Sequence, residues 1–223
     1  MFINQPPIEA QAYRDFIANR EFPCVAAKTA LTFEQLDCLV VDHLACPHDD
    51  QRILDFLYEF TDRYRASERL FHSAAVVFRG PTRPTEAQFD ELLWQRLQSL
   101  SDLDARRYAY DPRVVSDPAS PDFSFSLKEE AFFIIGMHPG SRRPARQFAY
   151  PTLVFNAHQQ FERLRTEDKY TKLRDTIRVR DVAYAGAINP MLRNFGDASE
   201  VLQYSGRMYD EAWQCPFVSK HAA

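Results

Sequence analysis

The chain has few glycines and no apolar segment long enough to cross a membrane. Only 6 of its 223 residues are glycine, and no apolar run approaches the ~20 residues that a membrane-spanning helix needs. The segment Met1–Pro7 lacks the basic region followed by an apolar stretch that is typical of a signal peptide. We therefore expect a soluble, cytoplasmic protein.

Paired cysteines and a strongly basic surface are also missing. No CxxC pair occurs among the four cysteines, which argues against a zinc site built on paired thiolates. A disulfide framework is not expected in a reducing compartment. The net charge of −4 and the pI of about 5.9 exclude the basic surface of a nucleic-acid-binding protein. The cysteines are Cys24, Cys38, Cys46 and Cys215.

The chain does have the length of one ordinary domain and many aromatic side chains. A chain of 223 residues can bury a proper core, so we expect residues 1–223 to form a single domain. The 18 phenylalanines and 10 tyrosines suit either an aromatic-rich core or an enclosed planar ligand. The order of elements predicts an α+β fold, with a mixed or antiparallel sheet of about five strands packed with helices.

Hydrophobic spacing locates these elements. Apolar residues at helical spacing predict helices at 8–19, 48–66 and 85–100, and a helical region over 156–180. Asn156 is a good N-cap for the last of these. Alternating or continuously apolar runs predict strands at 39–44, 74–78, 123–127, 131–137 and 152–155. Residues 128–130 suit a hairpin tip, although they include neither Gly nor Asn. Half of the glycines fall in the last forty residues, at Gly186, Gly196 and Gly206. Because glycine adopts backbone conformations that other residues rarely adopt, this clustering indicates a specially shaped backbone there.

The segment Gly136–Gln147 carries the main functional signal, because it places a histidine beside three arginines where an apolar strand ends. His138 follows the apolar run, and Pro139 stops the strand there. An imidazole at such an edge suits an axial heme ligand or a general base, and a structural histidine in a turn is the alternative. Heme needs one metal bond and partners for two propionates, so the segment predicts a heme site.

The three arginines of this segment are Arg142, Arg143 and Arg146. Guanidinium groups recognise carboxylates through paired hydrogen bonds, so these arginines suit heme propionates or a substrate carboxylate. The alternative is a solvated loop whose arginines form surface ion pairs. We expect Arg142 and Arg146 to hold the propionates, with Arg143 in reserve.

Three further residues are candidate axial ligands. His158 is expected in the first turn of a helix, whose positive end would keep its imidazole neutral, as a metal ligand must be. A thiolate from Cys215 or Cys24 would favour O–O cleavage, although each is equally readable as an ordinary buried thiol. Carboxylates able to hold a cationic substrate, which the sequence does not rank, are Glu130, Glu162, Asp181 and Glu200.

Several longer motifs resemble the YqcI/YcgG family. They follow one another in order over residues 20–217: Phe22–Lys28, Leu93–Gln98, Ser116–Pro118, Phe123–Ser126, Ala131–Pro139, Ser141-Arg142, Arg146, Phe148, Val154–Glu162, Asn189–Leu192, Phe195-Gly196, Gln203–Arg207 and Trp213–Phe217. Two positions depart from the family pattern. Leu127–Glu130 replaces expected glycines, and Gly186–Ile188 replaces an expected Gly-Ser. Both departures fall where they would alter a pocket wall.

The resemblance implies a particular chemistry. The family includes heme-dependent enzymes that N-hydroxylate guanidine groups, among them one in guanitoxin biosynthesis. It therefore implies heme b, O2, an electron donor such as a reductase or ferredoxin, and arginine or a related small guanidine as substrate. No nucleic-acid or membrane partner is expected, and a homodimer is left open.

We therefore predict a heme-dependent monooxygenase in which His138 is the first choice of iron ligand. His158, Cys215 and Cys24 are the alternative ligands, and Glu130 or Glu162 would orient the guanidinium. A heme-binding sensor or carrier without turnover is one alternative function. A heme-free enzyme that uses His138 and the arginines on an anionic metabolite is the other.

Overall fold

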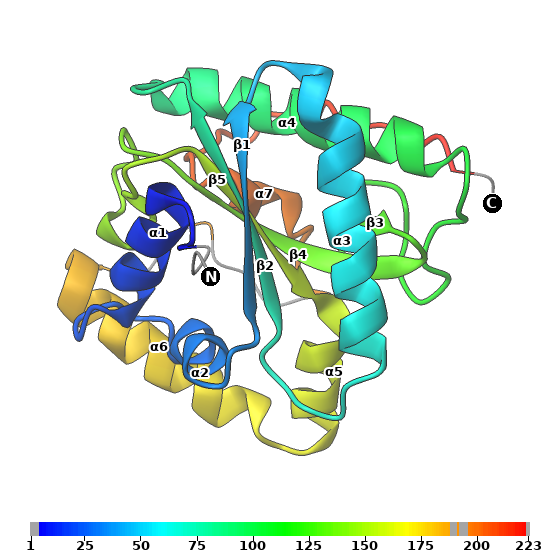
Figure 1. The fold of residues 1–223 in the computed structure, drawn as a ribbon. Helices are drawn as coiled ribbons and strands as arrows, with labels where there is room; N and C mark the ends of the chain where they lie inside the picture. Colours follow the sequence, from blue (N-terminus) through cyan, green and yellow to red (C-terminus); the bar gives the residue numbers. More distant parts are fainter. Residues whose placement is uncertain (1–4, 188–190, 192–195, 222–223) are drawn as a thin grey trace.

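The computed structural model describes residues 5–187, 191 and 196–221, and a five-stranded sheet lies at its centre (Figure 1). β1 and β2 are parallel, and the other neighbouring pairs are antiparallel. This mixed sheet confirms the predicted single-domain α+β fold. In spatial order the strands are β1 (Leu36–His43), β2 (Ser73–Gly80), β5 (Thr152–Ala157), β4 (Glu130–Met137) and β3 (Phe125–Leu127).

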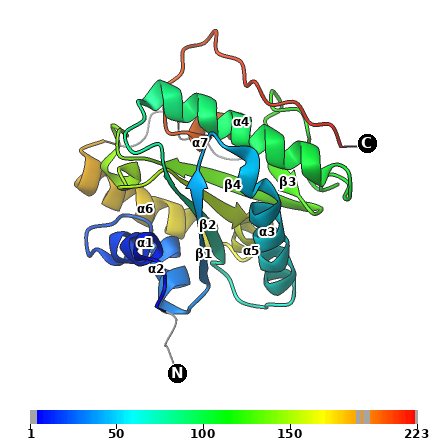
Figure 2. The same ribbon diagram turned by 45° about the horizontal axis from the view of Figure 1, so that its top comes forward.

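Helices cover both faces of the sheet (Figures 1 and 2). Buried residues of α3, α4 and α7 form a core on one face, and those of α1 and α2 form a second core on the other. The α-helices are α1 (Ile8–Ala18), α2 (Val25–Thr32), α3 (Asp50–Arg65), α4 (Glu86–Asp104), α5 (His158–Thr166), α6 (Tyr170–Ala185) and α7 (Val201–Tyr204). Two short 3-10 helices are η1 (Pro47–Asp49) and η2 (Pro144–Arg146).

The interior strand β2 shows why helices cover both faces of the sheet. Successive side chains of a strand point to opposite faces. Val76 and Phe78 accordingly belong to the core under α3 and α4, whereas Ala75 and Val77 belong to the core under α1 and α2. All four side chains are buried. A strand buried on both faces has a continuous apolar sequence, which is why the run at 74–78 predicts a strand without predicting its faces.

Most predicted elements are confirmed within a few residues, but three expectations are wrong or incomplete. Asn156 is not an N-cap: it lies in β5, where its side chain accepts a hydrogen bond from Ser73 Oγ at 3.0 Å. The helix begins after Ala157 without a side-chain cap. The helical region predicted for 156–180 is two helices, separated at Asp168, whose φ is 55°. The sequence patterns did not predict α2.

The predicted hairpin tip joins β3 to β4, and its two residues lie in the left-handed region. Lys128 has a φ of 51° and Glu129 a φ of 56°. Such a turn ordinarily uses Asn or Gly, and this is where glycines were expected from the family pattern. Arg65 Nη2 donates to the carbonyl oxygens of both residues at 2.9 Å. These contacts offset a backbone cost on the order of 1 kcal/mol per residue.

The glycine cluster is explained by backbone conformation. Gly186, Gly196 and Gly206 have φ values of 80°, 87° and 83°, a region that residues with a side chain rarely adopt. Of the family-like motif at 189–192, only Met191 is described, and Ile188 and Phe195 also lie outside the described residues. None of the described helices is long and apolar enough to span a membrane.

Candidate functional site

The residues predicted to form one site lie at two opposite ends of β4. Glu130 begins the strand, and His138 follows its last residue, Met137. A strand rises about 3.3 Å per residue, so roughly 26 Å separates the two backbone positions. Side chains at the two ends therefore do not act on one small substrate together.

At the far end of β4, His138 is a buried, neutral imidazole. Its side chain stacks on Phe89 with ring centroids 4.3 Å apart, and only 1% of the residue is exposed. Burial lowers the pKa of His138 to about 4, with Glu86 opposing and Arg146 assisting the change. Within the described residues, the buried Nδ1 atom has no hydrogen-bond partner. A neutral imidazole with an unpaired nitrogen is the form that binds a metal ion.

A pocket of about 630 Å³ lies beside this histidine, at the N-terminus of α4. Its wall includes three arginines, Arg83, Arg142 and Arg207, and one carboxylate, Glu86. His138 does not line the pocket, but its neighbours Pro139 and Gly140 do. Gly140 packs closely on the ring, because a Cβ atom there would lie 3.4 Å from His138 Nδ1.

The three predicted arginines do not converge on this pocket. Arg142 lines it and pairs with Glu86, with Nε 3.1 Å from Oε2. Arg143 instead forms an ion pair with Asp181 of α6. Arg146 turns inward and donates from Nη1 to the carbonyl oxygen of Tyr204 at 3.0 Å. Withdrawal from water, together with the nearby Arg143 charge, lowers the pKa of Arg146 to about 10.

The sequence-based reasoning missed Arg83, Glu86 and Arg207. Glu86 had one visible signal: it follows Thr85 and falls in the first turn of a predicted helix. Thr85 and Gln88 form a capping box there. Arg207 comes from the irregular C-terminal region, so no spacing rule connects it to α4.

The other predicted site residues gather at the opposite end of the sheet. His158 begins α5, directly after β5, and its Nε2 lies 3.5 Å from Glu162 Oε1. Burial, followed by the Arg165 charge, lowers the pKa of His158 to about 4. Glu162 also forms an ion pair with Arg165. His158, Glu162 and Glu130 are thus brought to one end, since Phe132 of β4 pairs with Ala157 of β5.

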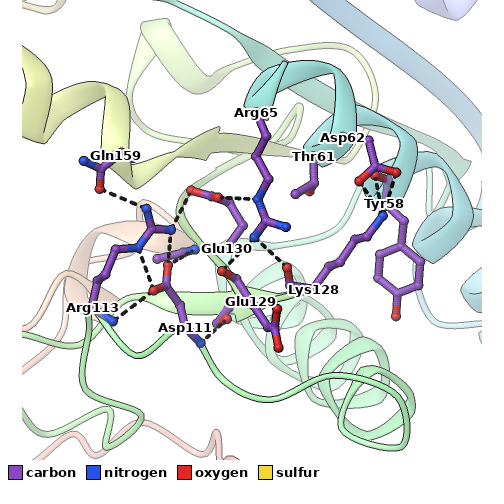
Figure 3. Close-up of polar contacts among 12 residues, drawn as sticks. Tyr58, Thr61, Asp62, Arg65, Asp111, Arg113, Lys128, Glu129, Glu130 and Gln159 are labelled. Carbon is purple, nitrogen blue, oxygen red and sulfur yellow. Dashed lines mark hydrogen bonds and ion pairs between the residues drawn. The ribbon is translucent and has the colours of Figure 1, made fainter. Parts of the chain in front are cut away.

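Glu130 is buried between two arginines at this end (Figure 3). Its Oε2 accepts from Arg65 Nε and its Oε1 from Arg113 Nη2, both at 3.1 Å. Asp111 accepts two hydrogen bonds from the same Arg113, from Nε to Oδ1 at 2.8 Å and from Nη2 to Oδ2 at 2.6 Å. Burial raises the pKa of Asp111, but the hydrogen bonds from Arg113 outweigh burial and hold the pKa below its ordinary value. A pocket of about 900 Å³ adjoins this cluster.

The two cysteine candidates lie in different cores and are protonated thiols. Cys24 packs against the core under α1 and α2, where its Sγ accepts from Ala27 N at 3.4 Å. Cys215 packs against the core under α3 and α4. Burial raises the pKa of both thiols, that of Cys215 to about 12. At neutral pH both side chains are thiols, and either one would have to release its proton to coordinate iron.

Among the described residues, no three His, Cys, Asp or Glu side chains are grouped so that they could hold a metal ion. This part of the chain therefore has no multi-ligand metal centre. Heme iron is a different case, because the porphyrin supplies four ligands and the protein needs to supply only one.

Comparison with known proteins gives a family and no characterised relative. No curated protein and no solved structure matches the chain. The model of the YqcI/YcgG family matches residues 13–218. Since the match spans nearly the whole chain, the protein belongs to the YqcI/YcgG family.

Proposed function

We propose that the protein is a heme-dependent monooxygenase that hydroxylates a guanidine-type nitrogen of arginine or a related small molecule. It would use O2 and electrons from a reductase or ferredoxin. The observation that carries the proposal is His138, a buried, neutral imidazole beside a pocket walled by three arginines, whose Nδ1 has no hydrogen-bond partner in the described part of the chain. The family membership and the motif resemblance support the same reading.

The residues at this end of the sheet fit heme in their chemistry. An imidazole binds iron through an unprotonated nitrogen, and burial keeps His138 neutral at physiological pH. Two propionates need cationic partners, and Arg83, Arg142 and Arg207 line the adjacent pocket. Arg143 and Arg146, committed to Asp181 and Tyr204, would not take part in binding the propionates.

The chain's own contribution would be ligation, charge and orientation. A bound heme supplies the activation of O2 and the oxidation itself. His138 would hold the iron, and the pocket arginines would neutralise the propionates. Glu86 is the carboxylate that lines this pocket, and a guanidinium substrate would replace the Arg142 side chain as the partner of Glu86, because a carboxylate offers two parallel acceptors to a guanidinium. Glu130 and Glu162 lie at the other end of β4, so we assign the orientation of the substrate to Glu86 instead.

His158 is an alternative iron ligand for the same function, at the other end of the sheet. It is also buried and neutral, and it lies with Glu130 and Glu162, the two carboxylates first assigned to the substrate. His158 itself does not line the pocket of about 900 Å³, although Gln159 and Arg163 of the same helix do. The two arrangements predict different outcomes for single histidine variants.

Absorption spectra of protein expressed with a heme precursor test the proposal. We expect a Soret band in the wild type and its loss or shift in His138→Ala. His158→Ala, Cys215→Ala and the exposed-site control His48→Ala should leave the spectrum unchanged. A spectral change confined to His158→Ala would move the site to the other end of the sheet. A folded, colourless protein that ignores added hemin would refute the heme assignment.

Turnover is tested separately with reduced protein, O2, and arginine, 2-aminoimidazole or other guanidines. The expected product gains the mass of one oxygen atom. Bound heme without oxygen consumption that responds to any guanidine would instead identify a sensor or carrier.

A further inference from the structure

The pocket of about 900 Å³ at the β3–β4 hairpin is distinct from the pocket beside His138, and it is built around arginines that are fixed in position. Figure 3 shows Glu130 between Arg65 and Arg113, with Asp111 on the inner side of Arg113. Asp111 and Glu130 are only 1% and 2% exposed, whereas the side chains of Arg65 and Arg113 are 39% and 44% exposed. Two buried carboxylates thus fix two arginines whose side chains remain partly exposed to solvent.

The acceptor atoms of this cluster are already in use. Both oxygens of Glu130 accept from arginine, and both oxygens of Asp111 accept from Arg113. Gln159 Oε1 accepts from Arg113 Nη1 at 3.1 Å. At these acceptors a cationic ligand would have to displace an arginine, at the cost of a charge-assisted hydrogen bond. Among the described residues, the exposed Glu129 is the one pocket carboxylate that no arginine contacts through its side chain.

Donor atoms, in contrast, are available on the pocket wall. Arg65 bonds through Nε and Nη2, and its Nη1 donates to no protein atom within the described residues. Arg163, which also lines the pocket, donates from Nη2 to the Glu68 carbonyl oxygen at 3.0 Å. Among the described residues, no acceptor bonds Nε or Nη1 of Arg163. The wall therefore presents guanidinium N–H groups to a ligand.

We propose that this pocket binds a small organic carboxylate, a site separate from the proposed heme site. The ligand carboxylate would repeat the contact that Glu130 makes, since a planar pair of oxygens suits arginine N–H groups. Three arginines and three carboxylates line the pocket, so its formal charge is balanced. A balanced wall favours a carboxylate monoanion over a phosphate dianion. Tyr64, Tyr110 and Val114 provide contacts for an organic body.

The hairpin at the rim of the pocket is an independent sign of a specialised site. Lys128 and Glu129 hold left-handed backbone without being glycine, and such conformations concentrate where a structure is pre-organised for binding. Arg65 donates to the carbonyl oxygens of Lys128 and Glu129 in this turn, and also to the carboxylate of Glu130. One side chain therefore couples the turn to the pocket wall.

Calorimetric titration of the full chain at low salt tests the site with benzoate, benzamide and inorganic phosphate. Benzamide has the shape of benzoate without its charge. We expect benzoate to bind at least tenfold more tightly than either benzamide or phosphate. Arg163→Gln should weaken benzoate binding about tenfold, the effect of losing one charge-assisted hydrogen bond. Arg65→Lys, which keeps the charge but not the planar fork, should also weaken it.

Two control variants separate this pocket from its surroundings. Arg165→Gln changes a residue of α5, the helix that carries Arg163, but Arg165 does not line the pocket. Arg142→Gln changes a residue of the pocket beside His138. Both should leave benzoate affinity unchanged. Equal binding or no binding of benzoate and benzamide, tighter binding of phosphate, or an unaffected Arg163→Gln variant would overturn the proposal. Competition between benzoate and hemin would also overturn it, by assigning the pocket to the cofactor.

Discussion

Glu200 is a carboxyl group buried in the core, and its ionisation should control the pH dependence of stability. The residue is only 4% exposed and precedes α7 at the N-cap position, without a capping hydrogen bond from its side chain. Ser124 Oγ donates to its Oε1 at 2.9 Å, and Tyr204 Oη donates to the same oxygen. Burial raises the pKa of Glu200 from 4.5 to about 8, although these two hydrogen bonds act in the opposite direction.

The magnitude follows from the difference between the folded and unfolded states. A carboxyl group whose pKa is raised on folding contributes stability that is fully present below its unfolded pKa. That stability is lost as the pH rises through the folded pKa. Between 4.5 and about 8, at about 1.4 kcal/mol per pKa unit, the loss amounts to about 5 kcal/mol. The amide of Glu200→Gln keeps an acceptor oxygen for Ser124 and Tyr204 but does not ionise.

Urea unfolding followed by circular dichroism from pH 4 to pH 9 measures this effect. The free energy of unfolding of the wild type, minus that of Glu200→Gln, should fall by about 5 kcal/mol across this range. Ser124→Ala removes a hydrogen bond that lowers the pKa, so it should move the fall to higher pH. A difference between wild type and Glu200→Gln that does not change with pH would refute the reasoning.

Three further substitutions test the buried ion pair of Asp111 and the backbone at two glycines. Asp111→Asn should lower the free energy of unfolding by about 1–3 kcal/mol at pH 7, because Arg113 loses one of its two charged partners. The difference from wild type should shrink as the pH falls below 3.8, the ordinary pKa of Asp, because the unfolded state then binds the proton before the folded state, whose pKa is lower. A constant difference in urea titrations would contradict this. Gly206→Ala should cost about 2 kcal/mol or more, since it combines a φ of 83° with a Cβ only 2.9 Å from Arg146 Cδ. Gly196→Ala has a similar φ, and the nearest described atom lies 3.9 Å from its Cβ. It should cost about half as much when both variants are compared by thermal unfolding.

Local patterns predicted the elements well where one physical cause dominates. The apolar stripes of α3 and α4 repeat within a few residues of sequence, and both helices are observed where expected. Asn156 failed as a predicted cap because a tertiary contact with Ser73, 83 residues away, keeps it in β5. Helix α2 was missed because Ala30 is its one buried residue, which leaves no strong periodic signal.

The candidate site was harder to predict, because nearness in sequence is a poor guide to where side chains point. Arg142, Arg143 and Arg146 are neighbours in the chain, yet their partners are Glu86 of α4, Asp181 of α6 and the carbonyl oxygen of Tyr204. His138 was a sound choice of buried imidazole. The carboxylates paired with it in the sequence-based prediction lie at the other end of the same strand.

The amino-acid sequence by itself determined the fold class, most helices and strands, the need for glycine at three C-terminal positions and the family. These features depend on local periodicity, backbone conformation and ordered motifs, which a linear chain displays directly. Only the tertiary structure decided which charged groups meet. Arg65, Arg113 and Glu130 come from three separate parts of the chain, and burial of Glu130 between the two arginines depends on how those parts pack.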